Sequence, residues 1–207
     1  MKLIVISNPI NLKDEHSILC SLFDAGLKYY HLRKPDFTYK ELEEYIQQIP
    51  KQYRDKVILH SHHQLAVEYG VKGVHFTNKN PYQESDNFQK NMHHSASFHS
   101  LGEIKNATPI FQYVFISPVF DSISKADHKT QIDKTALKLF LQRETKTTEI
   151  IALGGINSDT IAEAADMGFD GMALLGSIWM SGKPIESFKE LLSVTGGFNK
   201  IENNIHV

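Results

Sequence analysis

Two glycine-containing segments in the last third of the chain have the composition of an anion-binding site. Each is a short apolar run that ends in glycine before a helical pattern begins, at Gly154-Gly155 in the first segment and at Gly176-Ser177 in the second. Such a turn presents bare backbone N–H groups at the start of a helix, where the helix dipole favours negative charge. One loop of this kind is more often only a tight turn, but two on consecutive strands predict a phosphate site.

Arg33 is the first cation that could complete such a site. In the segment His31-Leu32-Arg33, the alternation of a strand places His31 and Arg33 on one face and Leu32 on the other. A guanidinium that projects into a pocket binds phosphate or pyrophosphate through paired hydrogen bonds, and His31 beside it is a candidate acid or base. The alternative is a solvent-exposed arginine that pairs with Asp36.

Ser122, Ser124 and Lys125 form a third group of candidate anion ligands. They fall within four residues, on a loop that Pro118 stiffens. Two hydroxyl groups and an ammonium group can surround a polyanion with hydrogen-bond donors and one positive charge. Serine and lysine are also ordinary loop residues, so this pattern alone is a weak signal.

The histidines suggest hydrogen bonding or acid–base chemistry rather than a metal centre. His60, His62 and His63 cluster near the end of one apolar run, and His75 and His99 end neighbouring elements. No H-E-x-x-H pattern, no H-x-H with a carboxylate and no cysteine pair accompanies them, and scattered imidazoles are more often pocket or surface residues than zinc ligands. We therefore expect no metal site, and expect the histidines at the strand ends to exchange hydrogen bonds or protons in a pocket.

Short apolar runs that alternate with helical patterns would position these groups. Eight runs have the length and composition of strands, at residues 2–6, 29–33, 57–60, 72–76, 92–97, 113–116, 149–153 and 171–175. Eight strand–helix alternations, with no G-x-G-x-x-G after the first strand, favour a single closed (β/α)8 TIM barrel of the α/β class over an open doubly wound sheet. The active site of such a barrel lies at the carboxyl ends of the strands.

Capping residues and apolar spacing predict the helices between these strands. Thr38 and Glu41 have the spacing of a capping box, and Asn157 or Ser158 is expected to cap the helix after the seventh strand. Other predicted helices cover residues 63–69, 101–106, 135–142 and 184–192.

The composition fits one compact domain with a small-molecule partner. The 207 residues are 41% hydrophobic, and we expect a barrel domain over 1–195 and a tail without periodicity over 196–207. A formal net charge of −2 argues against a surface for nucleic acid or an anionic membrane.

Cys20 is the only cysteine and is expected to be a packed thiol. With no signal-peptide or transmembrane pattern, the expected location is the cytoplasm, and a homo-oligomer is left open.

Taken together, the motifs resemble the thiamine phosphate synthase and TenI (thiazole tautomerase) family of small barrels. The resemblance covers nearly the whole chain. It is carried by His31-Leu32-Arg33, Gly73-Val74-His75, Ser95-Ala96-Ser97-Phe98-His99, Ser117-Pro118-Val119-Phe120 with Ser122, Ser124 and Lys125, and Ala152-Leu153-Gly154-Gly155-Ile156.

This resemblance implies a transferase of thiamine biosynthesis. A synthase of this family condenses hydroxymethylpyrimidine pyrophosphate with thiazole phosphate and releases pyrophosphate, with Mg²⁺ as cofactor. The residues that the resemblance implies are Arg33, Ser122, Ser124 and Lys125 for pyrophosphate, Ser97 for the pyrimidine, and Gly155, Gly176 and Ser177 for the thiazole phosphate. Of the further strand-end groups, we assign catalysis to His31 with Arg33 and Lys125, and substrate binding to His60, His75, His99 and Gly154.

The chain departs from the family pattern at the Mg²⁺ ligands. The family's N-D after the third strand aligns with His60-Ser61, and its G-Q-x-D after the fourth strand aligns with 77–80, so both carboxylates are missing. Uncharged oxygens bind a hard dication poorly, which puts the Mg²⁺ cofactor in doubt. The family's strand-two lysine aligns with Pro35, and the adjacent Lys34 is a candidate substitute.

Three other functions stay open. A TenI-like thiazole tautomerase works without a metal, although the family's tautomerase histidine aligns with Pro118, so that His31, His60 or His99 would have to act as the base. A non-catalytic barrel could bind thiazole phosphate or thiamine phosphate. A different phosphate-dependent barrel enzyme, such as an isomerase or epimerase, would usually carry acidic residues at its strand ends.

Overall fold

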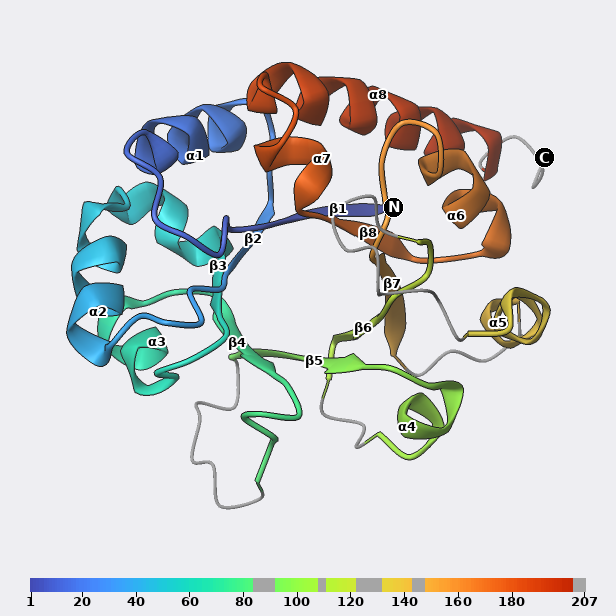
Figure 1. Cartoon of the computed structure of the whole chain (residues 1–207), viewed down its shortest axis with the longest axis horizontal. Coiled ribbons are helices and arrows are strands. Elements are labelled where there is room, and N and C mark those ends of the chain that lie inside the picture. Colours follow the sequence, from blue (N-terminus) through green and yellow to red (C-terminus); the bar gives the residue numbers. More distant parts are fainter. Residues whose placement is uncertain (84–91, 108–110, 122–131, 143–147, 203–207) are drawn as a thin grey trace.

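Eight parallel strands close into a barrel in the computed structural model, which describes residues 1–83, 92–107, 111–121, 132–142 and 148–202. Each strand pairs with the next along the chain, and β1 (Lys2–Ile6) also pairs with β8 (Gly171–Leu174), so the sheet has no edge. Helices surround this ring of strands (Figure 1). The predicted (β/α)8 barrel is confirmed, and the pairing of β1 with β8 excludes the open sheet.

All eight strands lie where the apolar runs predict them. The remaining strands are β2 (Tyr29–Leu32), β3 (Val57–Leu59), β4 (Gly73–Phe76), β5 (His93–Phe98), β6 (Tyr113–Ile116) and β7 (Glu149–Leu153). The helices are α1 (Glu15–Asp24), α2 (Tyr39–Gln48), the 3-10 helix η1 (Lys51–Lys56), α3 (Gln64–Tyr69), α4 (Leu101–Lys105), α5 (Lys134–Leu141), α6 (Ile161–Met167), α7 (Gly176–Trp179) and α8 (Pro184–Glu202). The helix start expected at Gly176 is the short helix α7, and α8 continues past the expected end at 192 and through position 196. Among the described residues, no helix is long and apolar enough to cross a membrane.

One of the two predicted helix caps is present and the other is wrong. The Thr38 hydroxyl accepts from the backbone N–H of Glu41, and the Glu41 carboxylate accepts from the N–H of Thr38, which completes the predicted capping box. Helix α6 begins later than expected, with Thr160 at its N-cap. The Asn157 side chain instead accepts from two backbone N–H groups of the turn before the helix, because asparagine readily bonds to the backbone two residues on.

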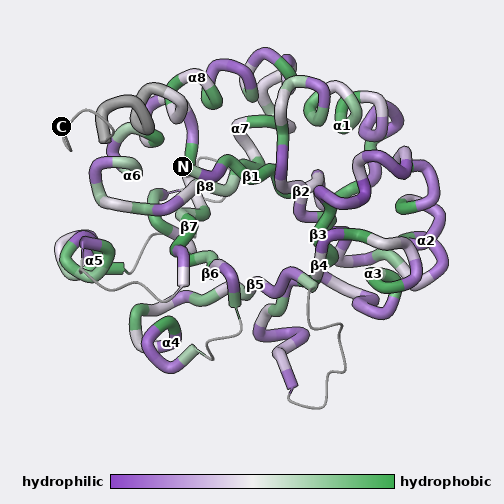
Figure 2. Tube along the Cα trace, turned by 180° about the vertical axis from the view of Figure 1, so that it is seen from behind, coloured by the Kyte–Doolittle hydropathy of each residue, from purple (hydrophilic) through white to green (hydrophobic). Residues whose placement is uncertain are grey.

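The buried core has one part inside the barrel and a larger part between the barrel and the helices. Inside the barrel, β1 and β7 contribute aliphatic side chains such as Ile4, Ile6 and Ile151. The opposite side, from β2 to β6, carries histidine, serine and tyrosine at inward positions, and Figure 2 shows the contrast between hydrophobic β1 and hydrophilic β5. Buried polar groups need hydrogen-bond partners, so this half of the interior must contain a polar network.

Candidate active site at the carboxyl ends of the strands

Three histidines from consecutive strands meet inside the barrel. His31 on β2 and His75 on β4 are fully buried, and His60, which follows β3, is 9% exposed. The parallel register brings them together, since His31 pairs with Ile58 and Ile58 pairs with Gly73, each two residues before the next histidine. Nδ1 of His31 lies 2.9 Å from Nε2 of His60, and the rings of His60 and His75 stack with centroids 4.2 Å apart.

Hydroxyl groups from β5 and β6 hold this histidine cluster in place. The Tyr113 hydroxyl lies 2.6 Å from Nε2 of His31. The two ring nitrogens of His75 lie 2.8 Å from Oγ of Ser95 and 2.7 Å from Oγ of Ser97. Through the contact of Ser97 with His75, the structure joins four predicted site residues, His31, His60, His75 and Ser97, in one network.

The cluster is electrically neutral at physiological pH. Burial is the main cause that lowers the pKa of His31, His60 and His75, and for His75 the pKa falls to about 3. The neighbouring histidines lower these pKa values further, and the positive charge of Arg33 does so for His60 and His75. Each imidazole is therefore an uncharged group that can donate one hydrogen bond and accept one.

Sequence reasoning missed Tyr113 and Ser95. Both face inward because they share the strand alternation of Phe115 and Ser97, respectively. That alternation was readable, but an aromatic residue on a buried strand is expected to belong to the hydrophobic core, and nothing in the sequence indicated that His31 needs a hydroxyl partner.

Arg33 lies at the end of β2 with an exposed side chain. Its backbone is fixed, because Oγ of buried Ser7 accepts from the N–H of Arg33 at 2.8 Å and donates to its carbonyl at 2.9 Å. No ion pair with Asp36 is found among the residues that the structure describes, so the predicted alternative pairing is absent there. The guanidinium charge acts on the histidine cluster across the mouth of the barrel.

Lys34 does not replace the missing family lysine. Its side chain is fully buried, forms an ion pair with the fully buried Glu15 and donates to the carbonyl of Ile10 at 2.9 Å. Lys34 lies two residues after Leu32, the last residue of β2, and shares its outward direction, toward Glu15 on α1. The expectation that Lys34 contributes to the site is wrong.

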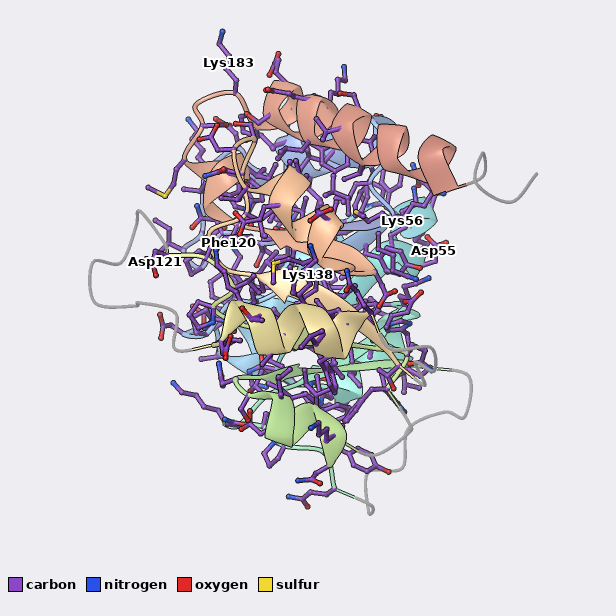
Figure 3. All side chains as sticks on the ribbon, turned by 90° about the vertical axis from the view of Figure 1, so that its right-hand side faces the viewer. Asp55, Lys56, Phe120, Asp121, Lys138 and Lys183 are labelled. Carbon is purple, nitrogen blue, oxygen red and sulfur yellow. The ribbon has the colours of Figure 1, made fainter. Side chains whose placement is uncertain are left out.

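The glycine loop after β7 packs against the loop after β6. The backbone N–H of Val119 donates to the carbonyl of Leu153 at 3.0 Å, and that of Phe120 donates to the carbonyl of Gly154 at 3.2 Å. Gly155 has a φ of +67°, and a Cβ there would lie 2.7 Å from Cβ of Phe120 and 2.8 Å from the carbonyl oxygen of Asp121. Phe120 and Asp121 are labelled in Figure 3. Both the backbone conformation and the close approach therefore require glycine.

Replacing Gly155 with alanine is expected to cost more stability than the same change at a glycine in open space. Gly70 is the matched control, because its φ is +63° and no atom lies within 4 Å of an added Cβ. Gly70→Ala should cost about 1 kcal/mol for the left-handed backbone, and Gly155→Ala about 1–3 kcal/mol more for the collision. Urea unfolding of both variants measures the difference, and equal losses would contradict the packing of this loop.

The loop after β8 leads directly into α7 at Gly176. The Trp179 indole N–H donates to the carbonyl of Ile6 at 2.7 Å, which fixes α7 against the end of β1. The buried Oγ of Ser177 has no hydrogen-bond partner among the described residues. A buried hydroxyl without a partner is uncommon and is explained when a ligand supplies the missing bond.

His99, another predicted site residue, lies apart from this network. His99 is exposed at the end of β5, with Nδ1 2.9 Å from the carbonyl oxygen of Ser117. Ser122, Ser124 and Lys125 fall outside the residues that the structure describes.

The positions aligned with the family's magnesium ligands do not fit Mg²⁺. Thr77 and Asn80 bond to each other through their backbones, and the Asn80 amide contacts the ring of His63. His60 and Ser61 occupy the other position. Because hard dications bind charged oxygens, this set of neutral groups gives Mg²⁺ no carboxylate at either place.

A cavity of about 590 Å³ lies at the opposite, amino-terminal end of the barrel. Its lining includes Lys2, Tyr29 and Glu149 at the strand starts and Leu192 on α8. Catalysis in (β/α)8 barrels takes place at the other end, where the strands finish. The candidate site is therefore the mouth formed by the histidine cluster, Arg33 and the two glycine loops, not this cavity.

The fold and the polar mouth define a (β/α)8-barrel protein with its chemistry at the carboxyl ends of the strands. Residues 3–178 match the thiamine monophosphate synthase family. The chain belongs to this family and is a thiamine-phosphate synthase-like transferase of thiamine biosynthesis. The predicted family resemblance is confirmed.

Individual relatives agree with this assignment. The thiamine-phosphate synthase of Listeria monocytogenes serovar 1/2a is 30% identical over 146 residues, which cover 69% of this chain and 68% of that protein. The crystal structure of a thiamine phosphate pyrophosphorylase from Bacteroides thetaiotaomicron is 31% identical, covers 95% of this chain and 98% of that one, and has a TM-score of 0.78. A thiamine phosphate pyrophosphorylase from Pyrococcus furiosus shares the fold with a TM-score of 0.80 at 20% identity, covering 95% of this chain and 96% of that one.

Proposed function

We propose that this chain condenses hydroxymethylpyrimidine pyrophosphate with thiazole phosphate and releases pyrophosphate. The observation that carries the proposal is the buried Ser177 hydroxyl without a partner, beside Gly176, at the position that the family resemblance assigns to the thiazole phosphate. The phosphate would accept from this hydroxyl and from backbone N–H groups of the Gly155 and Gly176 loops. These loops lie after neighbouring strands, since β7 pairs with β8.

The reaction requires positive charge on the leaving pyrophosphate. The bond between the pyrimidine methylene carbon and the ester oxygen breaks, the thiazole nitrogen forms the new bond to that carbon, and the electron pair leaves with pyrophosphate. Arg33 has an exposed guanidinium at the mouth of the barrel that forms no ion pair among the described residues. This guanidinium would hold two pyrophosphate oxygens. Ser122, Ser124 and Lys125, outside the described residues, remain predicted to contribute the other donors.

The pyrimidine would lie against the histidine cluster. Oγ of Ser97 is held by Nε2 of His75, whose Nδ1 is held in turn by Ser95. This support fixes the orientation of a hydroxyl that can donate to or accept from a ring nitrogen or amino group of the pyrimidine. No step is assigned to Mg²⁺, because the aligned positions provide no carboxylate to bind it.

The direct test is a turnover assay with both phosphorylated precursors, run with Mg²⁺ and separately with a chelator, with thiamine phosphate measured as product. The purified protein is expected to form thiamine phosphate. Arg33→Ala is expected to lower the turnover number about 100-fold or more while thiazole phosphate binding stays unchanged, and Arg33→Lys to retain part of the activity because the charge remains.

Two other outcomes would replace the proposal. Isomerisation of a thiazole carboxylate phosphate, supplied alone, would favour the tautomerase. Tight calorimetric binding of thiazole phosphate with no product at high enzyme concentration would favour a non-catalytic binding protein.

A further inference from the structure

We propose that the histidine cluster of His31, His60 and His75 binds one transition-metal dication of the zinc class, with a coordination position open toward the mouth of the barrel. One ring nitrogen from each residue lies within 4.8 Å of the other two, and all three residues are buried. Three imidazoles with an open fourth position form a known type of catalytic zinc site. This proposal concerns a nitrogen-ligated metal and does not depend on the Mg²⁺ positions of the family.

The geometry needs only a local closure of the rings. A zinc–nitrogen bond is about 2.0–2.1 Å, so tetrahedral ligands stand roughly 3.3 Å apart. Nδ1 of His31 and Nε2 of His60 are already 2.9 Å apart. The His75 nitrogen lies within the 4.8 Å limit, so it would have to approach by roughly 1.5 Å at most, and this shift would cost its bond to Ser97.

The hydroxyl groups behind the cluster suit metal ligands. Metal-bound histidines usually hydrogen-bond through the nitrogen that does not face the metal, and that bond fixes the ring and its tautomer. Tyr113 holds Nε2 of His31, which leaves Nδ1 of that ring for the metal. Ser95 holds Nδ1 of His75, and Nε2 of His75 would exchange its bond to Ser97 for the metal. Released from Nε2 of His75, from which it now lies 2.7 Å, the Ser97 hydroxyl would be placed to bond a metal-bound water.

His60 supplies a second, independent observation. Its Nδ1 is buried without a hydrogen-bond partner among the described residues, although the residue is more than nine-tenths buried. An unsatisfied buried polar atom of this kind indicates a missing water or ion. Nε2 would bind the metal in place of its bond to His31, and a water at Nδ1 would satisfy the second nitrogen.

The charge balance indicates what completes the site. The cluster contains no carboxylate, so the bound dication would keep its full charge, and Arg33 adds a further positive charge at the same mouth. An anionic ligand is therefore required at the open position, and a phosphate or pyrophosphate oxygen of a substrate has that charge. A simple buffer anion or hydroxide would occupy the position in the absence of substrate.

The test uses the full chain, freed of metal with a chelator and titrated with Co²⁺ and then Zn²⁺. We expect one equivalent of Co²⁺ to bind with visible d–d absorption, Zn²⁺ to displace it, and Zn²⁺ to raise the melting temperature. His60→Gln, at the rim of the cluster, and His75→Asn, in its interior, should each weaken binding more than about 100-fold, and Tyr113→Phe about 10-fold, while circular dichroism checks that each variant folds.

His16→Gln is the control, because His16 lies on α1 and bonds to the Tyr45 carbonyl away from the cluster. It should bind Co²⁺ like the parent protein. The proposal is overturned if the parent protein fails to bind one equivalent of Co²⁺ at micromolar concentration, or if His60→Gln and the parent protein bind equally. Because binding is measured without turnover, this result is independent of whether the condensation assay succeeds.

Discussion

Lys34→Met is expected to lower the free energy of unfolding by about 3–5 kcal/mol, the cost of leaving a buried charge without its partner. Lys34 and Glu15 are both fully buried, and Glu15 also accepts from the Tyr30 hydroxyl at 3.1 Å. Methionine has a similar length but no charge, so the Glu15 carboxylate would remain in the interior without a cation. Urea unfolding at pH 7 measures the loss.

Two further variants isolate the buried pair. Lys40→Met removes an exposed partner of Glu44 on the surface of α2 and should change stability by no more than about 0.5 kcal/mol. The double variant Lys34→Met/Glu15→Gln should recover part of the loss, because no buried charge remains. If Lys34→Met and Lys40→Met had equal effects, the buried ion pair would contribute no more to the free energy of unfolding than the exposed pair.

Acidification from pH 7 to pH 5 is expected to destabilise the metal-free protein by about 4 kcal/mol through His75 and His93 together. Burial lowers the pKa of His75 to about 3 and, with the charge of Lys72, that of His93 to about 4. Both imidazoles bind a proton more weakly in the folded state than in the unfolded state, where the pKa is near 6.5. The contribution of the two neutral histidines to the free energy of unfolding is therefore fully present above pH 6.5 and is lost as the pH falls toward 3–4. The loss reaches about 2 kcal/mol per histidine by pH 5.

Urea midpoints at several pH values between 7 and 5, in the presence of a chelator, measure this dependence. His31 and His60 add to it in the same direction, because burial lowers the pKa of each. His93→Gln should remove about 2 kcal/mol of the dependence. A stability that is unchanged between pH 7 and pH 5 would show that these histidines are not held neutral by burial.

The sequence predicted the scaffold because period-two and helical patterns depend on local spacing. Strand alternation placed His31 on the face opposite Leu32, and the His31 side chain lies buried inside the barrel. The expectation for Lys34 came from the family resemblance and was wrong, because Lys34 lies two residues after Leu32, on the same outward face, and pairs with Glu15.

The network around the histidines depended on information that spacing does not contain. The bonds of Tyr113 to His31 and of Ser95 to His75 join residues 82 and 20 positions apart, so only the closed barrel brings them together. The sequence groups His60 with His62 and His63, and only the closed barrel brings His60 to His31 and His75. The sequence shows directly the glycine that the close approach at Gly155 requires, while phosphate binding by the two glycine loops stays a prediction.

A crystal structure of the protein with thiazole phosphate tests the central claim most directly. The phosphate is expected within hydrogen-bond distance of the Ser177 hydroxyl and of the backbone N–H groups at Gly155 and Gly176, with the thiazole ring directed toward the histidine cluster. A phosphate bound elsewhere, for example in the cavity at the amino-terminal end, with the Ser177 hydroxyl still without a partner, would contradict the proposed site and the function that rests on it.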